Sequence, residues 1–122
     1  MQESGEMYLE TILVLGKEKK RVRAIDIVER LNYSRPSVSR ALSILRSEGC
    51  ITVDRESSIF LTEKGTEIAE KIYERHNVLS EALRSIGVDA ETARADACRI
   101  EHVISDTSFS SIKAHMQQMS AR

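Results

Sequence analysis

Apolar side chains recur at helical spacing over most of the chain. In the N-terminal half this spacing predicts one helix over residues 7–15 and a second over residues 24–31. Ser34 is suited to cap a third helix, and Pro36 would fall in its first turn, where a missing N–H costs nothing. Gly49 would close this helix, because glycine tolerates a left-handed backbone. We therefore expect two short helices, joined by a tight turn, after the first helix.

Two short β-prone runs follow the third helix. They cover residues 51–54 and 59–61, and the polar residues 55–58 between them have the length of a hairpin turn. Three helices and a hairpin, in this order, predict a winged helix-turn-helix.

The second half of the chain is predicted to be helical throughout. The spacing indicates helices over residues 62–86 and 89–105, and a third from about Thr107. The long helix carries an apolar stripe with alternating steps of three and four residues, in which His76 is a polar member. The expected fold class is therefore mainly α, with an N-terminal winged helix-turn-helix followed by an all-helical domain.

The charge of the chain is distributed unevenly. Over 122 residues the formal net charge is only −1, but residues 16–46 hold nine basic side chains against three acidic ones. A basic segment suits a surface that meets phosphates, although a solvated charged face would have the same composition. Every long apolar run is interrupted by charge, and the N-terminus lacks a basic, apolar signal sequence. We therefore expect a cytoplasmic protein that makes no membrane contact.

The third predicted helix has an outward face suited to DNA. In a helix-turn-helix the second helix of the motif enters the major groove. The third predicted helix of this chain has that position, and its outward face presents small, polar or cationic side chains without an acid among them. Arg40 can offer two donors to guanine, and Pro36 can contact a thymine methyl group, while neighbouring side chains suit phosphates. A protein-binding winged helix is the alternative. The predicted DNA-binding residues are Arg30, Ser34, Arg35, Pro36, Ser37, Ser39, Arg40, Arg46 and, on the wing, Arg55.

A single domain of this size would contact only a short half-site. We therefore expect a homodimer on a two-fold symmetric, double-stranded DNA operator. The apolar faces of the last two predicted helices are the expected place for the dimer contact.

One short motif points to a metal. Cys98, Glu101 and His102 have the spacing i, i+3, i+4, which places a thiol, a carboxylate and an imidazole on one face of a predicted helix. Such mixed donors favour a divalent transition metal over Ca²⁺ or Mg²⁺. A buried cysteine beside an exposed Glu-His pair would give the same pattern. His76 is a further ligand or a core histidine, and Cys50 is predicted to be a core thiol.

Four segments of the chain, residues 6–13, 34–40, 61–65 and 97–106, together resemble the motifs of a known family, and the resemblance covers essentially the whole chain. These motifs are similar to those of the diphtheria-toxin-repressor family of metal-dependent regulators, which includes the manganese transport regulators. The resemblance implies a DNA-binding domain, here residues 1–62, and a helical metal-binding and dimerisation domain, here residues 63–122. It also implies a homodimeric repressor of metal-uptake genes that binds Fe²⁺ or Mn²⁺.

The ligand positions that the resemblance implies form a mixed pattern. Met7 and Cys98 match the iron-responsive branch of the family, whereas Glu10 matches the manganese branch. Soft sulfur donors disfavour Mn²⁺, so we expect Fe²⁺, with Mn²⁺, Co²⁺, Ni²⁺ and Zn²⁺ as alternatives. The implied metal ligands are Met7, Glu10, His76, Cys98, Glu101 and His102.

Two alternatives stay open on the sequence. One is a winged-helix regulator without a metal switch, in which Cys98 is a structural or redox thiol. The other is a zinc hydrolase, which would need three ligands, an open coordination position and a nearby base. The sequence shows neither a glycine-rich loop nor a lid, so we expect a regulator and not an enzyme.

Overall fold

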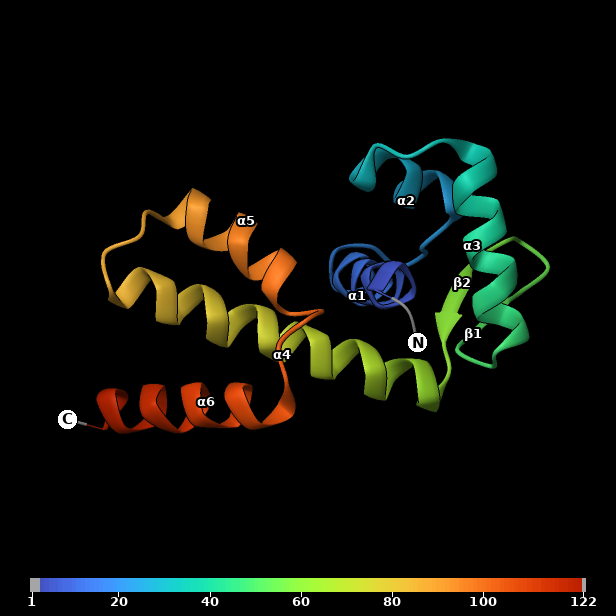
Figure 1. Cartoon of the computed structure of the whole chain (residues 1–122). Helices are drawn as coiled ribbons and strands as arrows, with labels where there is room; N and C mark the ends of the chain where they lie inside the picture. The colour runs from blue at the N-terminus through green and yellow to red at the C-terminus, as the bar shows by residue number, and fades with distance from the viewer. Residues whose placement is uncertain (1–2, 122) are drawn as a thin grey trace. The chain divides into compact units, whose positions relative to one another are not determined.

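A computed structural model describes residues 3–121 (Figure 1). The chain divides into two compact units, the first ending at Glu70 and the second beginning at Lys71. No helix within the described range is long and apolar enough to cross a membrane. The elements in chain order are α1 (Glu3–Glu18), α2 (Ala24–Leu31), α3 (Arg35–Ser47), β1 (Ile51–Val53), β2 (Ile59–Leu61), α4 (Glu63–Ser85), α5 (Ala90–Ile100) and α6 (Asp106–Ser120).

The first unit has the predicted order of three helices and a hairpin. Its helices share a core that includes the fully buried Leu9 and Ile27. Ser34 caps α3, because its hydroxyl accepts a hydrogen bond from the Ser37 backbone N–H at 3.2 Å. Gly49 follows the helix with φ of 78°, in the left-handed region. The predicted start and end of this helix are therefore confirmed.

Strands β1 and β2 form a short antiparallel hairpin. Thr52 lies opposite Phe60 in the register. Asp54 shapes the turn, because one carboxylate oxygen accepts hydrogen bonds from the backbone N–H groups of Glu56 and Ser58, each at 2.9 Å. The predicted wing is present, one residue shorter in its first strand.

Gly65 lets the start of α4 lie against the chain that leads into the wing. A Cβ atom at this position would overlap the backbone carbonyl oxygen of Cys50. The same carbonyl accepts a hydrogen bond from the Thr62 backbone N–H at 3.0 Å, and the Thr62 hydroxyl accepts one from the Gly65 N–H at 3.1 Å. Cys50 itself is fully buried, which confirms the prediction of a core thiol.

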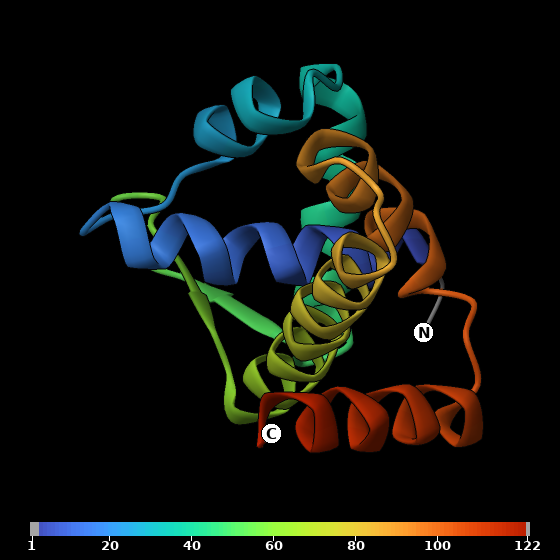
Figure 2. The ribbon, with the colours of Figure 1, turned by 90° about the vertical axis from the view of Figure 1, so that its left-hand side faces the viewer.

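The second unit contains the later part of α4 together with α5 and α6, which flank it (Figures 1 and 2). Leu79, Ala97 and Phe109, one from each helix, lie at the centre of its core. Asp89 caps α5, since its carboxylate accepts a hydrogen bond from the Thr92 backbone N–H at 3.0 Å. The start of α5 is therefore set by a local signal that the sequence shows.

Helix α5 is shorter than predicted. The apolar pattern extends it to about Ser105, but the helix ends at Ile100 and residues 101–104 form a turn. The reason lies in α4, where the Arg75 guanidinium donates to the carbonyl oxygens of Glu101 at 3.3 Å and Ile104 at 2.8 Å. Ser105 then has an extended backbone and caps α6. The prediction of one helix through this segment is wrong.

Candidate functional site

A buried carboxylate lies between two histidines in the second unit. Glu101 is fully buried at the end of α5. Its Oε2 atom lies 3.0 Å from Nδ1 of His76 on α4, and its Oε1 atom lies 3.4 Å from Nε2 of His102. The His76 side chain is 19% exposed, and the His102 side chain is fully buried. The structure thus brings three of the predicted metal ligands together.

The surroundings of this carboxylate fit a bound cation. Oε1 of Glu101 has no hydrogen-bond partner among residues 3–121. Burying a carboxylate is costly unless donors or a positive charge compensate it. A divalent cation would supply that charge, and imidazole nitrogen with carboxylate oxygen is a donor set that transition metals accept. The residues present therefore fit the metal that the sequence predicts.

The remaining predicted ligands are one residue of α5 and two residues of the first unit. Cys98 is half-buried in the last turn of α5. Met7 and Glu10 belong to α1, in the first unit, and both are half-buried. The Tyr33 hydroxyl donates a hydrogen bond to the Met7 sulfur at 3.4 Å, a contact that the sequence does not reveal. The participation of Met7, Glu10 and Cys98 in one site stays a prediction.

Arg75 lies next to this site and is absent from the residues that the sequence predicts for it. It is only 6% exposed. Besides the two carbonyl groups, its guanidinium pairs with the Asp106 carboxylate and lies over the Phe109 ring, 5.3 Å from the centroid. One sequence signal was available, because Arg75 stands three residues after Ile72 and four before Leu79, both of which are buried. A charge at that helical spacing falls on the buried face.

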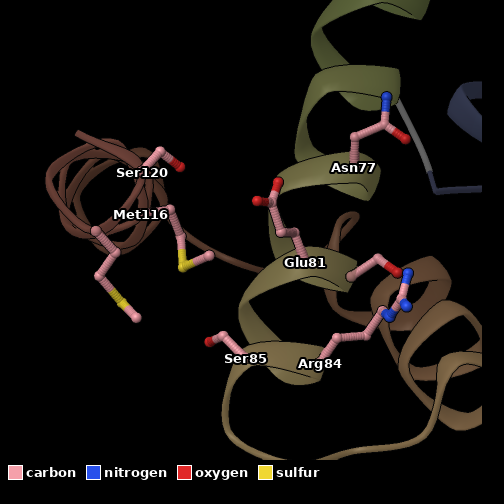
Figure 3. Close-up of a pocket in the computed structure, with 8 residues that line it drawn as sticks. Asn77, Glu81, Arg84, Ser85, Met116 and Ser120 are labelled. Atoms are coloured by element: carbon pink, nitrogen blue, oxygen red, sulfur yellow. The ribbon is translucent and has the colours of Figure 1, made fainter. Parts of the chain in front are cut away.

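A hollow of about 750 Å³ lies between α4 and α6 (Figure 3). Polar side chains of α4, including Glu81 and Arg84, form one wall, and Met116 and Met119 of α6 contribute the other. None of the predicted metal ligands lines it. The hollow is therefore distinct from the cluster around Glu101.

The predicted DNA-binding residues lie on the surface of the first unit. Ser37 is half-buried and the others are exposed. The Ser37 hydroxyl accepts hydrogen bonds from the Ser34 hydroxyl at 2.8 Å and from the Arg40 guanidinium at 3.4 Å. These contacts hold a cation near the N-terminal end of α3, which is the end that a recognition helix directs at base edges.

Several cations of the basic segment already have acidic partners. Within the described residues, cations of residues 16–46 form ion pairs that include Lys19–Asp26, Arg21–Glu56 and Arg30–Glu18. The hydrogen bond from Lys19 is the main cause that lowers the pKa of Asp26 below its ordinary value. Arg30 pairs with the Glu18 carboxylate, so a phosphate contact by Arg30 would compete with this ion pair.

Comparison with known proteins places both units in one family. The family model for the iron dependent repressor N-terminal DNA binding domain matches residues 1–58, and the model for the metal binding and dimerisation domain matches residues 62–121. The chain is 32% identical to the transcriptional regulator MntR of Escherichia coli O6:H1 over 115 residues, which cover 94% of this chain and 74% of that protein. It is 36% identical to the iron-dependent repressor IdeR of Mycobacterium bovis over 105 residues, 85% of this chain and 46% of that protein.

A solved structure has the same fold. The manganese regulator SloR matches with a TM-score of 0.81 at 24% identity, over 93% of this chain and 53% of that chain. The chain thus spans about half the length of that protein. The resemblance found in the sequence motifs is confirmed, and the family consists of transcriptional regulators, which are not enzymes. The chain belongs to the iron-dependent repressor family, the metal-dependent transcriptional repressors related to the diphtheria toxin repressor.

Proposed function

We propose that this protein represses metal-uptake genes when a divalent transition metal, by preference Fe²⁺, is bound. The observation that carries the proposal is the fully buried Glu101 carboxylate between the imidazoles of His76 and His102. The ligand set that we propose is Met7, Glu10, His76, Cys98, Glu101 and His102.

The ligand types favour iron over manganese. Relatives of this chain are named for iron and for manganese, so family membership leaves the ion open. The sulfur atoms of Met7 and Cys98 are soft donors, which suit Fe²⁺ and Co²⁺ better than the harder Mn²⁺. Because a cysteine ligand must lose its proton, metal affinity should fall as the pH falls.

DNA binding is assigned to residues 1–62, and metal binding with dimerisation to residues 63–122. The exposed start of α3 supports the first assignment, since it offers cations and small polar groups to the major groove. A homodimer would present two such helices to a palindromic operator in the cytoplasm. On the second unit, large apolar side chains that stay exposed and suit a subunit contact include Ile86, Val103 and Met119.

The proposed ligands come from both domains, and this is the basis of regulation. Occupancy of the site would then depend on the same arrangement of domains that binds the operator, so the two affinities are linked. By linkage, operator binding should also raise metal affinity by an equal factor.

Anaerobic titration of the full chain tests this proposal. Fe²⁺, Co²⁺ and Mn²⁺ are titrated separately by calorimetry, and DNA affinity is measured in parallel by fluorescence anisotropy. We expect metal to raise operator affinity, with Mn²⁺ the weakest ligand of the three. If saturating concentrations of all three ions leave DNA affinity unchanged, the metal switch is wrong.

Paired substitutions separate this proposal from a regulator without a metal switch. Replacing Cys98 and His102 by alanine should abolish the metal response, whereas a structural pair would mainly lower the thermal midpoint. His115 is an exposed histidine of α6, and His115→Ala serves as the matched control. A metal response that survives the double substitution would favour a structural or redox role for Cys98.

A further inference from the structure

We propose that Arg75 is a positioning residue for the metal site, holding the turn that carries Glu101 and His102 without binding metal itself. The inference rests on the proposed metal site and adds a residue outside its ligand set. Arg75 directly precedes His76 in α4, and it is almost completely buried. Burying a guanidinium is costly unless its donors are used, so its contacts indicate its role.

The first contacts are with the backbone of the ligand-bearing turn. Arg75 donates to the carbonyl oxygens of Glu101 and Ile104, at 3.3 Å and 2.8 Å. The last carbonyl groups of a helix lack partners within the helix, so donors from elsewhere decide how the chain leaves it. The two acceptors stand on either side of His102. Arg75 therefore fixes the backbone from which both side chains project.

The other contacts tie the same guanidinium to the start of α6. Arg75 pairs with Asp106, the first residue of that helix, and stacks over Phe109. Lys71 also contacts the Asp106 carboxylate, at 3.3 Å, and is the main cause of the lowered pKa of Asp106. The planar guanidinium can serve carbonyl and carboxylate acceptors together, which a lysine ammonium does less well.

Electrostatics and positioning predict opposite effects for the loss of this side chain. A guanidinium next to a ligand histidine repels a divalent cation, so on charge alone a neutral residue at position 75 would strengthen metal binding. If Arg75 acts by holding the turn, the neutral residue weakens binding instead. The sign of the change in affinity therefore decides between the two roles.

The experiment uses the full chain and Co²⁺ as the probe. Co²⁺ is titrated by calorimetry and visible absorption into the wild type and the Arg75→Met, Arg75→Lys and Lys71→Met variants. Arg75→Met should weaken binding by about 10- to 100-fold, the usual effect of removing a group that orients ligands. The Co²⁺ affinity of Arg75→Lys should lie between those of the wild type and Arg75→Met, because lysine keeps the positive charge but lacks the planar guanidinium that donates to several acceptors at once. Lys71→Met, the matched control, loses an exposed cation that pairs with the Asp106 carboxylate and should bind like the wild type.

A metal-free measurement adds an independent readout. Amide hydrogen exchange over residues 101–105 should be faster in Arg75→Met than in the wild type, with α4 unchanged. Unchanged or tighter Co²⁺ binding by Arg75→Met overturns the inference, and so does an equal loss in Lys71→Met. If Arg75→Met does not fold, Arg75→Lys decides by the same criterion. A wild type that binds no Co²⁺ would refute the proposed function instead, while the exchange measurement would still test Arg75.

Discussion

Replacing Glu101 by glutamine should stabilise the metal-free protein and remove its response to metal. The amide keeps the size of the side chain and an oxygen for His76, but it removes the negative charge. In the wild type the carboxylate is fully buried, and Oε1 lacks a hydrogen-bond partner among residues 3–121. In the wild type, Oε1 lies 3.4 Å from Nε2 of His102. The side-chain amide of glutamine, with its nitrogen in the place of Oε1, would donate a hydrogen bond to that imidazole nitrogen.

The magnitude follows from the burial of this group. An unsatisfied buried polar group costs about 1–3 kcal/mol, so the metal-free variant should gain free energy of unfolding in that range. For a domain of this size each kcal/mol moves the thermal midpoint by roughly 4 °C, which predicts a rise of about 4–12 °C. Metal at a hundred times its Kd should stabilise the wild type by about 2.7 kcal/mol and the variant far less. Metal should therefore narrow or reverse the difference between the two proteins.

Thermal unfolding with a chelator and with Co²⁺ measures both effects. Glu74→Gln is the control, because it makes the same chemical change at an exposed residue of α4 that pairs with Lys113 at 3.1 Å. The free energy of unfolding of Glu74→Gln should differ from that of the wild type by less than about 1 kcal/mol. A lower metal-free midpoint for Glu101→Gln would show that the carboxylate stabilises the histidines, which refutes the reasoning from uncompensated charge. An undiminished Co²⁺ response would remove Glu101 from the ligand set.

Three further predictions concern the first unit. Glu18→Gln frees Arg30 from its exposed ion pair and should raise affinity for duplex DNA by roughly two- to five-fold at low salt, as measured by anisotropy; an unchanged affinity would mean that Arg30 makes no phosphate contact. Gly65→Ala should lower the free energy of unfolding by about 1–3 kcal/mol in denaturant titrations, because the added methyl group overlaps a backbone carbonyl; a neutral result would mean that α4 shifts freely. The pKa of Asp26 is lowered, chiefly by Lys19, so the pair stabilises the folded state above the ordinary pKa of the carboxyl and loses this effect as the pH falls through the lowered value. The stability difference between the wild type and Asp26→Asn should therefore shrink on acidification in urea titrations, and a difference constant with pH would contradict this account.

Local signals predicted most of the helices and strands. Ser34 and Asp89 cap their helices through backbone N–H groups three residues away, and Gly49 supplies a left-handed backbone next to the end of α3. Such interactions depend on a few neighbouring residues, so the pattern of the sequence contains them. The first helix begins four residues earlier than its apolar stripe, since the polar residues from Glu3 onward continue it without adding to the core.

Contacts between distant residues could not be predicted in the same way. The hydrogen bond from Tyr33 to the Met7 sulfur joins residues 26 positions apart, as does the contact of Arg75 with the Glu101 carbonyl. The approach of His76 to Glu101 spans 25 positions. The apolar stripe marked His76 as a donor that faces the interior, but spacing along one helix says nothing about which partner on another helix it meets.

The disagreement between pattern and structure is greatest at the proposed metal site. Elsewhere caps, turns and apolar spacing agree with the fold, but at residues 101–104 an apolar helical pattern gives way to a turn held by Arg75. The same turn keeps a fully buried carboxylate, one oxygen of which lacks a hydrogen-bond partner within residues 3–121, although burying such a group is costly. The contacts of Arg75 account for the turn, but they leave Oε1 of Glu101 without a hydrogen-bond partner among residues 3–121, and a cation bound beside His76 would compensate that carboxylate. A departure from local rules together with a destabilising charge is typical of a segment shaped by function, and this supports binding at the turn independently of the motif spacing.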